Sequence, residues 1–189
     1  MSINSCKTDS RTYKNLQFTE YNMKIETPIG FKSANAKEIK ESYNLGSKDA
    51  MKHGYFSDSI QNNLLFLNKG EFSTIKIKYT PLSKEEIKDY KALWENFKKM
   101  TFDIINKEKM IESTIDTTSR IENINGIAFY VFETNVNLLD LKNNKTRLRL
   151  LRYSTPLNEL DLAINADYIN QIDEEDILKT IRSIRITKK

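Results

Sequence analysis

One long amphipathic segment places the strongest constraint on how this chain can fold. It begins at Ser83 and reads SKEEIKDYKALWENFKKMTFDIINKEK. Glu86 follows Ser83 by three residues, which is the spacing of a capping box at the start of a helix. The stripe that recurs at helical spacing comprises Ile87, Tyr90, Leu93, Trp94, Phe97, Thr101, Ile104 and Ile105. About 24 helical residues predict a rod of about 36 Å, and we expect its aromatic face to pack on a sheet.

Segments on both sides of this helix show the period of two that is typical of strands. The stretch NNLLFLNKGEFSTIKIKYTP predicts a hairpin, with a strand at Leu64–Leu67, a turn at 68–71 and a return strand at Phe72–Tyr79. We expect Lys76 and Lys78 to point away from an apolar side formed by Phe72, Ile75, Ile77 and Tyr79. After the helix, four more strands are predicted within MIESTIDTTSRIENINGIAFYVFETNV, KTRLRLLRYST and NELDLAINAD.

The remaining segments complete an α+β layout. We expect one half-buried strand over Asn15–Glu26, one or two short helices within residues 35–54, and a helix in DEEDILKTIRSIRI that has Asp173 as its cap. The order of these elements predicts an antiparallel sheet covered by helices. It runs from a strand through short helices, a hairpin, a long helix and an antiparallel meander to a final helix. We expect a flexible leader or tether over residues 1–15 and a single α+β domain over residues 16–189.

The charge pattern bears on the class of partner. The net charge is +4 over 189 residues, and the basic residues are interleaved with Asp and Glu along the whole chain. Nucleic-acid-binding domains more often carry a larger excess that is clustered in a stripe, so we expect no nucleic-acid partner. The sequence has no run of about eighteen apolar residues, so it predicts no membrane-spanning helix.

Few residues offer catalytic or metal chemistry. His53 is the one histidine, and a single His with one distant Cys cannot form a zinc site. The acidic residues between 161 and 176 lack the central glycine of a calcium loop, and a solvated helix N-terminus explains them. The five glycines are scattered and form no phosphate-binding loop. We therefore expect no enzyme, no cofactor and no metal, with an unrecognised hydrolase as an alternative.

The single cysteine, Cys6, excludes an internal disulfide and lies in a polar stretch before the first predicted strand. Ile3, Asn4, Ser5 and Cys6 resemble the end of a bacterial lipoprotein signal, with an aliphatic residue three before the cysteine and a small residue next to it. The resemblance implies that Cys6 is lipidated and that the domain is membrane-anchored in the bacterial cell envelope, facing the periplasm or the cell surface. The alternative is that Cys6 is an ordinary small residue in a flexible terminus.

One predicted strand carries a row of cations. Lys145, Arg147 and Arg149 alternate with uncharged residues, so a strand places all three on one face, and Arg152 follows nearby. We predict that these four residues bind an acidic protein partner or anionic lipid head groups. The alternative is a solvated sheet face, or an edge strand that its charges protect from pairing.

Several stretches resemble a known family. The opening MKIETPIGFKSA, the long amphipathic helix and the ending DILKTIRSIRI resemble the PsbP-like, or Mog-type, α/β/α sandwich, in which a short Ser-Ile-x-Ile strand follows the last helix. The resemblance spans Phe18 to Ile186. It implies this fold and a binding or assembly role, and bacterial members of the family are often lipoproteins.

These expectations favour a non-catalytic envelope lipoprotein domain that binds a protein partner. One specific form of this hypothesis is an immunity protein that neutralises a secreted antibacterial toxin. A second hypothesis is an envelope assembly or carrier factor that binds a small apolar ligand between helix and sheet.

Overall fold

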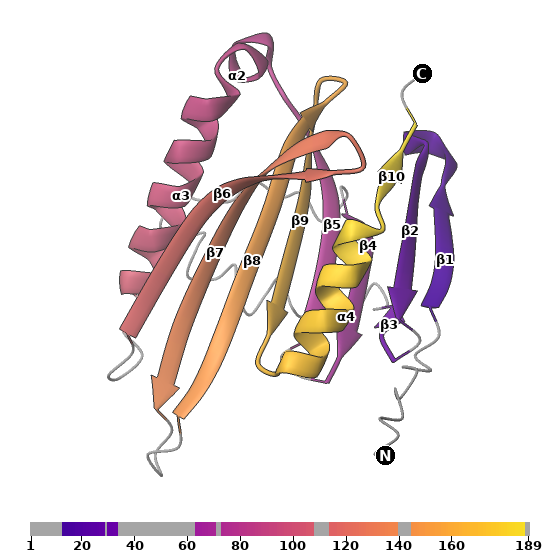
Figure 1. Cartoon of the computed structure of the whole chain (residues 1–189). Coiled ribbons are helices and arrows are strands. Elements are labelled where there is room, and N and C mark those ends of the chain that lie inside the picture. Colours follow the sequence, from indigo (N-terminus) through magenta and orange to yellow (C-terminus); the bar gives the residue numbers. More distant parts are fainter. Residues whose placement is uncertain are drawn as a thin grey trace, which may run out of the picture.

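The computed structural model describes residues 13–28, 30–33, 63–70, 73–107, 114–139 and 145–187, and these residues form an α+β fold (Figure 1). In chain order the elements are β1 (Tyr13–Phe18), the 3-10 turn η1 (Thr19–Tyr21), β2 (Met23–Pro28), β3 (Lys32–Ser33), β4 (Asn63–Lys69), β5 (Ser73–Pro81), α2 (Lys84–Lys88), α3 (Tyr90–Lys107), β6 (Thr114–Ile124), β7 (Ile127–Leu139), β8 (Lys145–Leu157), β9 (Leu160–Tyr168), α4 (Gln171–Arg182) and β10 (Arg185–Ile186).

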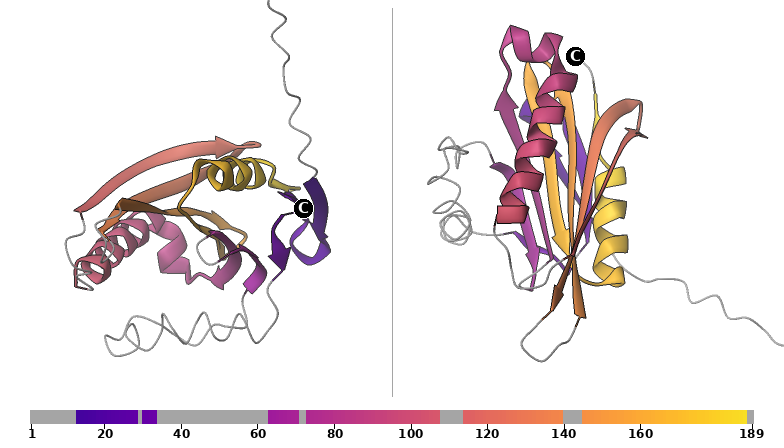
Figure 2. Two further views of the ribbon diagram at one scale, coloured as in Figure 1. Left: turned by 90° about the horizontal axis from the view of Figure 1, so that it is seen from below. Right: turned by 90° about the vertical axis from the view of Figure 1, so that its left-hand side faces the viewer.

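Two sheets and two helix layers make up the architecture. The larger sheet has seven strands in the order β3-β4-β5-β9-β8-β7-β6, and the smaller sheet has the order β1-β2-β10. All the neighbouring strands in both sheets are antiparallel. Helix α4 covers one face of the larger sheet and α3 covers the other (Figure 2). The predicted antiparallel sheet covered by helices is therefore confirmed.

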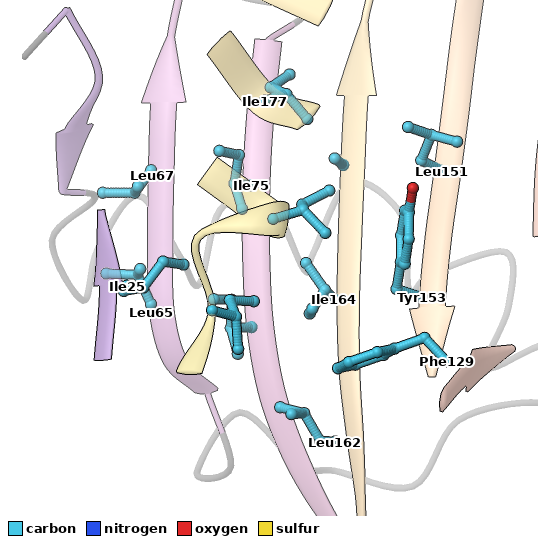
Figure 3. Close-up of a cluster of buried hydrophobic side chains, with 14 of the residues drawn as sticks. Ile25, Leu65, Leu67, Ile75, Phe129, Leu151, Tyr153, Leu162, Ile164 and Ile177 are labelled. Atoms are coloured by element: carbon cyan, nitrogen blue, oxygen red, sulfur yellow. The ribbon is translucent and has the colours of Figure 1, made fainter. Parts of the chain in front are cut away.

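The main core lies between α4 and the larger sheet (Figure 3). Ile75 and Ile77 of β5 point into it together with Ile164 of β9, and all three are fully buried. Helix α4 contributes Ile177 and Ile181, which lie over these strands and are also fully buried. Full burial of each such side chain contributes roughly 1.5–3 kcal/mol, so this interface is the main apolar contact of the fold. The predicted alternation along β5 is confirmed, although Phe72 lies outside the described residues.

Polar contacts anchor the beginning of α4 to the turn between β4 and β5. The Asp173 carboxylate accepts hydrogen bonds from Lys69 Nζ at 2.6 Å and from the Ser73 hydroxyl. The helix cap is Asn170, whose side chain accepts from the backbone N–H of Asp173 at 2.8 Å. The prediction that Asp173 caps the helix was therefore wrong, because Asp173 lies one turn later and its carboxylate points to the β4–β5 turn.

The segment predicted as one strand, Asn15–Glu26, is instead a hairpin. Residue Asn22 adopts a left-handed backbone conformation with φ of 47° and closes the turn after η1, so that β1 folds back onto β2. Asparagine tolerates this conformation better than most residues do. Strand β1 begins at Tyr13, within the range assigned to the leader.

The predicted long helix is present but is divided in two. Ser83 and Glu86 form the expected capping box, which confirms the start of α2. Asp89 leaves helical geometry, with φ of −123° and ψ of 51°, and its side chain accepts from the backbone N–H of Ala92 at 3.2 Å. This residue ends α2 and caps α3. The short helices predicted within residues 35–54 lie outside the described residues.

The end of the fold matches the family resemblance. After α4, the short strand β10 pairs with β2, with Arg185 opposite Lys24 and Ile186 opposite Met23. Of the predicted Ser-Ile-x-Ile strand, Arg185 and Ile186 form β10, whereas Ser183 is the C-cap of α4. None of the helices that the structure describes combines the length and the apolar composition of a membrane-spanning segment.

The anchor of α4 generates a pH-dependent prediction. Burial acts to raise the pKa of Asp173, but hydrogen bonds from Lys69, Ser73 and Asn170 outweigh it and hold the pKa below its usual range. Ionised Asp173 therefore stabilises the fold above the ordinary carboxyl pKa, and this contribution is lost as the pH falls through the lowered value. We expect Asp173→Asn to lower the free energy of unfolding by about 2 kcal/mol at neutral pH.

Urea unfolding of both proteins between about pH 7 and about pH 3 checks this expectation, because the difference between them should shrink with falling pH. Exposed Glu85, changed to Gln, serves as the control and should cause little change at any pH. A difference that stays constant across the series would contradict the assignment to Asp173.

Candidate functional site

Strand β8 carries the predicted basic residues, and its period of two decides where they point. Arg147 and Arg149 lie on the same side as buried Leu151, which faces α4. Lys145 is the first residue of β8, and only its backbone is described. Cys6, the predicted lipidation site, and His53 lie outside the described residues.

Helix α4 places an acidic side chain next to these basic residues. Glu174, in the first turn of α4, forms an ion pair with the Arg149 guanidinium, and about a quarter of each side chain is exposed. The Arg149 guanidinium also lies 5.8 Å from the centre of the Tyr168 ring. Burial raises the pKa of the Tyr168 phenol to about 12, so this residue is a neutral aromatic wall at physiological pH. The structure therefore neutralises one of the predicted cations.

These side chains border a hollow of about 460 Å³ between β8, the end of β9 and the first turns of α4. The lining residues are Arg147, Arg149, Tyr168, Ile169, Asn170, Gln171, Glu174, Glu175 and Leu178. A second hollow of about 470 Å³ lies on the other flank of α4, where Glu26 of β2 faces Lys179 and Arg182. Glu175 and Leu178 border both hollows, so α4 forms a ridge between them.

The first hollow combines charged and apolar groups at the surface. Arg147 is exposed and forms no ion pair or hydrogen bond with the residues that the structure describes. Ile169 borders the hollow and is 39% exposed, and Ile172 in the first turn of α4 is 63% exposed. Arginine is enriched at protein–protein interfaces, and exposed aliphatic groups beside it add apolar contact area. This arrangement can hold an inserted side chain and pair its carboxylate with Arg147.

Arg152, which the sequence grouped with the other cations, lies on the opposite face of the sheet. Its Nη2 donates to Asp161 of β9 at 3.2 Å, and its guanidinium stacks 3.9 Å from the centre of the Phe97 ring of α3. The hydroxyls of Tyr90 and Ser154 donate to the other oxygen of the same carboxylate at 2.5 and 2.6 Å. Arg152 is therefore part of a polar cluster beneath α3 and not part of the hollow.

The surroundings of this cluster shift several pKa values. Burial raises the pKa of the Tyr90 phenol far above its usual range, and the adjacent Asp161 charge raises it further. Burial lowers the pKa of the Arg152 guanidinium and of Lys78 on β5, while Asp161 acts against both shifts. Because one carboxylate joins β8, β9 and α3, we infer that the cluster holds α3 on the sheet.

Sequence reasoning did not identify the hollow itself. The walls formed by Glu174, Leu178 and Ile169 depend on how α4 docks, which no local pattern shows. The sequence does indicate that Arg152 lies on the other face of the strand from the other three cations. Side chains alternate between the two faces, and position 152 is even whereas the other three positions are odd. Within the described residues, no three His, Cys, Asp or Glu side chains gather as the ligands of a metal ion would.

The comparisons with known proteins identify the fold. The chain matches no protein-family model and no curated protein sequence. It is similar to the solution structure of cyanobacterial PsbP (CyanoP) from a Synechocystis species, with a TM-score of 0.55, 11% identity, and coverage of 98% of this chain and 99% of that one. It is also similar to the Saccharomyces cerevisiae Ran-binding protein Mog1p, with a TM-score of 0.44, 9% identity, and coverage of 94% and 96%. The PsbP-like fold expected from the sequence is thus confirmed, and at this identity function has to be argued from the site.

The cluster beneath α3 leads to a prediction about stability. Asp161→Asn leaves the Arg152 guanidinium, which is 17% exposed, without its counter-charge. We expect a loss of about 3 kcal/mol in the free energy of unfolding, since a buried charge left unpaired is strongly destabilising. Tyr90→Phe removes one hydrogen bond from the same carboxylate and should cost about 1 kcal/mol. Urea unfolding of the two variants measures both losses in the free energy of unfolding. Equal losses would show that the ion pair between Arg152 and Asp161 is not the dominant contact.

Proposed function

We propose that this protein is a non-catalytic domain that binds another protein through the hollow beside α4. The observation that supports the proposal is the combination, in one hollow of about 460 Å³, of Arg147 with the exposed side of Ile169 and half-buried Leu178. A cation that is not neutralised beside apolar surface attracts a segment that has both an acidic and an apolar side chain. Interfaces take much of their binding energy from a few residues, and arginine is enriched among them.

The charges around the hollow narrow the chemistry of the partner. The ion pair with Glu174 occupies Arg149, so a carboxylate from the partner would bind mainly at Arg147. The body of the inserted side chain would lie against Ile169 and Leu178, which form the accessible apolar part of the lining. Such an arrangement uses Arg147 for orientation and the apolar wall for affinity, and a surface charge of this type also speeds association at low salt.

A more specific form of the proposal places the domain in the bacterial cell envelope. Lipidation of Cys6 would anchor it in a membrane, and residues 7–12 would link the anchor to β1. One partner that suits a small tethered binding domain is a delivered antibacterial toxin, in which case the protein would act as its immunity protein. This form depends on the resemblance of residues 3–6 to a lipoprotein signal.

The docking site can be tested with a photo-crosslinking amino acid placed at position 147 or 169 in the native host. We expect both positions to give the same crosslinked partner, and the same replacement at exposed Lys91 on α3, which lies on the other face, to give none. Arg147→Glu should then weaken binding of that purified partner by about tenfold or more, because it turns an attractive contact into a repulsive one. Crosslinks from position 91 alone, or binding that Arg147→Glu leaves unchanged, would contradict the site.

The proposed lipid anchor on Cys6 has a separate test. When the complete reading frame is expressed in its host, we expect the protein in the membrane fraction and an intact mass that includes acyl chains on Cys6. Cys6→Ser should release the domain into the soluble fraction, since each buried methylene contributes about 0.8 kcal/mol to membrane attachment. A soluble wild-type protein without added mass would rule out the lipoprotein form while leaving the hollow open to a partner.

A further inference from the structure

Strand β6 is the outermost strand of the larger sheet, and nothing in the described part of the chain pairs with its outer edge (Figure 1). It has eleven residues, Thr114–Ile124, and β7 pairs with its inner edge along the full length. Unpaired strand edges of this length are templates for pairing with another strand. Ile121 near one end of β6 is 66% exposed, the largest exposed fraction among the large apolar side chains of the described residues.

When two copies of β6 are placed side by side in antiparallel order, the charged residues of one copy can lie opposite residues of the other sign in the second copy. A two-fold axis perpendicular to the sheet would place one residue of β6 opposite its own copy, with the flanking residues paired in antiparallel order. With Thr118 at the axis, Asp116 lies opposite Arg120 of the second copy, and this pair occurs twice. With Ser119 at the axis, Asp116 would lie opposite Glu122 of the second copy. With Arg120 or Asp116 at the axis, the same charge would face itself.

The register centred on Thr118 also matches the apolar residues. It places Ile115 opposite Ile121 of the second copy, again twice, on the face of the sheet that α3 covers. The two Asp116–Arg120 pairs lie on the other face, where Arg120 already contacts Glu133 at 3.4 Å and Glu122 at 3.5 Å. The guanidinium has five N–H donors, so it can also donate hydrogen bonds to a further carboxylate. Opposite charges and branched apolar residues are both favourable cross-strand pairs.

We propose that β6 pairs with β6 of a second copy of this chain, in the antiparallel register that has Thr118 on the two-fold axis. The product is a dimer in which the two seven-stranded sheets form one continuous sheet. Both α4 helices, and so both hollows that Arg147 borders, then face the same side. This inference is independent of the proposed function, because it uses none of the residues of the hollow.

The proposed interface is small, and its size sets the expected affinity. It consists of one strand edge and the side chains beside it, and α3 comes close on one face, where Lys98 Nζ lies 3.5 Å from the Ser119 hydroxyl. Interfaces below about 1,200 Å² are typical of weak and transient complexes. We therefore expect a dimerisation constant in the range of about 10 µM to 1 mM.

Sedimentation velocity of the purified protein from about 10 µM to 1 mM tests the dimer and its charges. Wild type should pass from monomer to dimer across this range. Asp116→Arg and Arg120→Asp should each raise the dissociation constant about tenfold or more, because each creates two like-charged pairs, and the double variant should restore it. Exposed Arg185 on β10, changed to Asp, is the matched control and should change nothing. Unfolding midpoints of all variants exclude loss of the fold as the cause.

The register has its own test in a Cys6→Ser background. Residues directly opposite each other in an antiparallel pair are about 4.5–5.5 Å apart between Cα atoms, a separation that a disulfide spans. Thr118→Cys should therefore give a disulfide-linked dimer on mild oxidation, and Thr114→Cys should not. The proposal would be overturned if the wild type stayed monomeric to 1 mM, or if the charge variants left the dimer unchanged. It would also be overturned if an extended peptide of another protein were found bound at this edge of a monomer.

Discussion

The alternation of apolar and charged residues along β5 and β9 is the constraint on which the rest of the structure depends. Ile75 and Ile77 point to one side of the sheet, and Lys76 and Lys78 point to the other. A shift of one residue in the pairing of β5 would bring both lysines under α4 and turn both isoleucines to the opposite face of the sheet. The alternation therefore selects the register, and the register decides which face α4 can cover. The opposite face, where Arg152 pairs with Asp161, can accept charged groups only because α3 brings hydroxyl and aromatic partners to it.

The elements that local chemistry specifies could be predicted from the sequence. The capping box at Ser83, the hairpin around Gly70 and the meander of four strands each have a signal within a few neighbouring residues. Two of the departures within the described elements have local causes that are harder to detect. Asn22 reverses the chain within what looks like one continuous strand pattern, and Asp89 interrupts a helix whose apolar stripe continues across it. In both cases a residue with a short polar side chain adopts a backbone conformation that the surrounding pattern does not suggest, and at Asp89 the side chain also accepts a hydrogen bond from the backbone.

The candidate site was predictable only in part, and the reason is physical. That Arg147 and Arg149 share a face follows from the period of two in any strand. That Glu174 neutralises Arg149 follows from the docking of α4, which brings together residues from two separate elements. The two faces of the sheet thus give the same residue type different roles. Arg152, stacked on Phe97, serves stability, whereas Arg147 remains at the surface and is suited to recognition.

The pairing of β10 with β2 has a consequence for how the chain reaches its native state. The backbone N–H of Glu26 donates to the Ser183 hydroxyl at 2.8 Å, and these residues are 157 positions apart in the chain. Contacts of such long range slow folding, because the entropy of closing a large loop is lost before the contact forms. Until α4 docks, the isoleucine-rich side of β5 and β9 and the edge of β2 are both uncovered. A chain in which α4 has not docked would therefore present an apolar surface that favours aggregation.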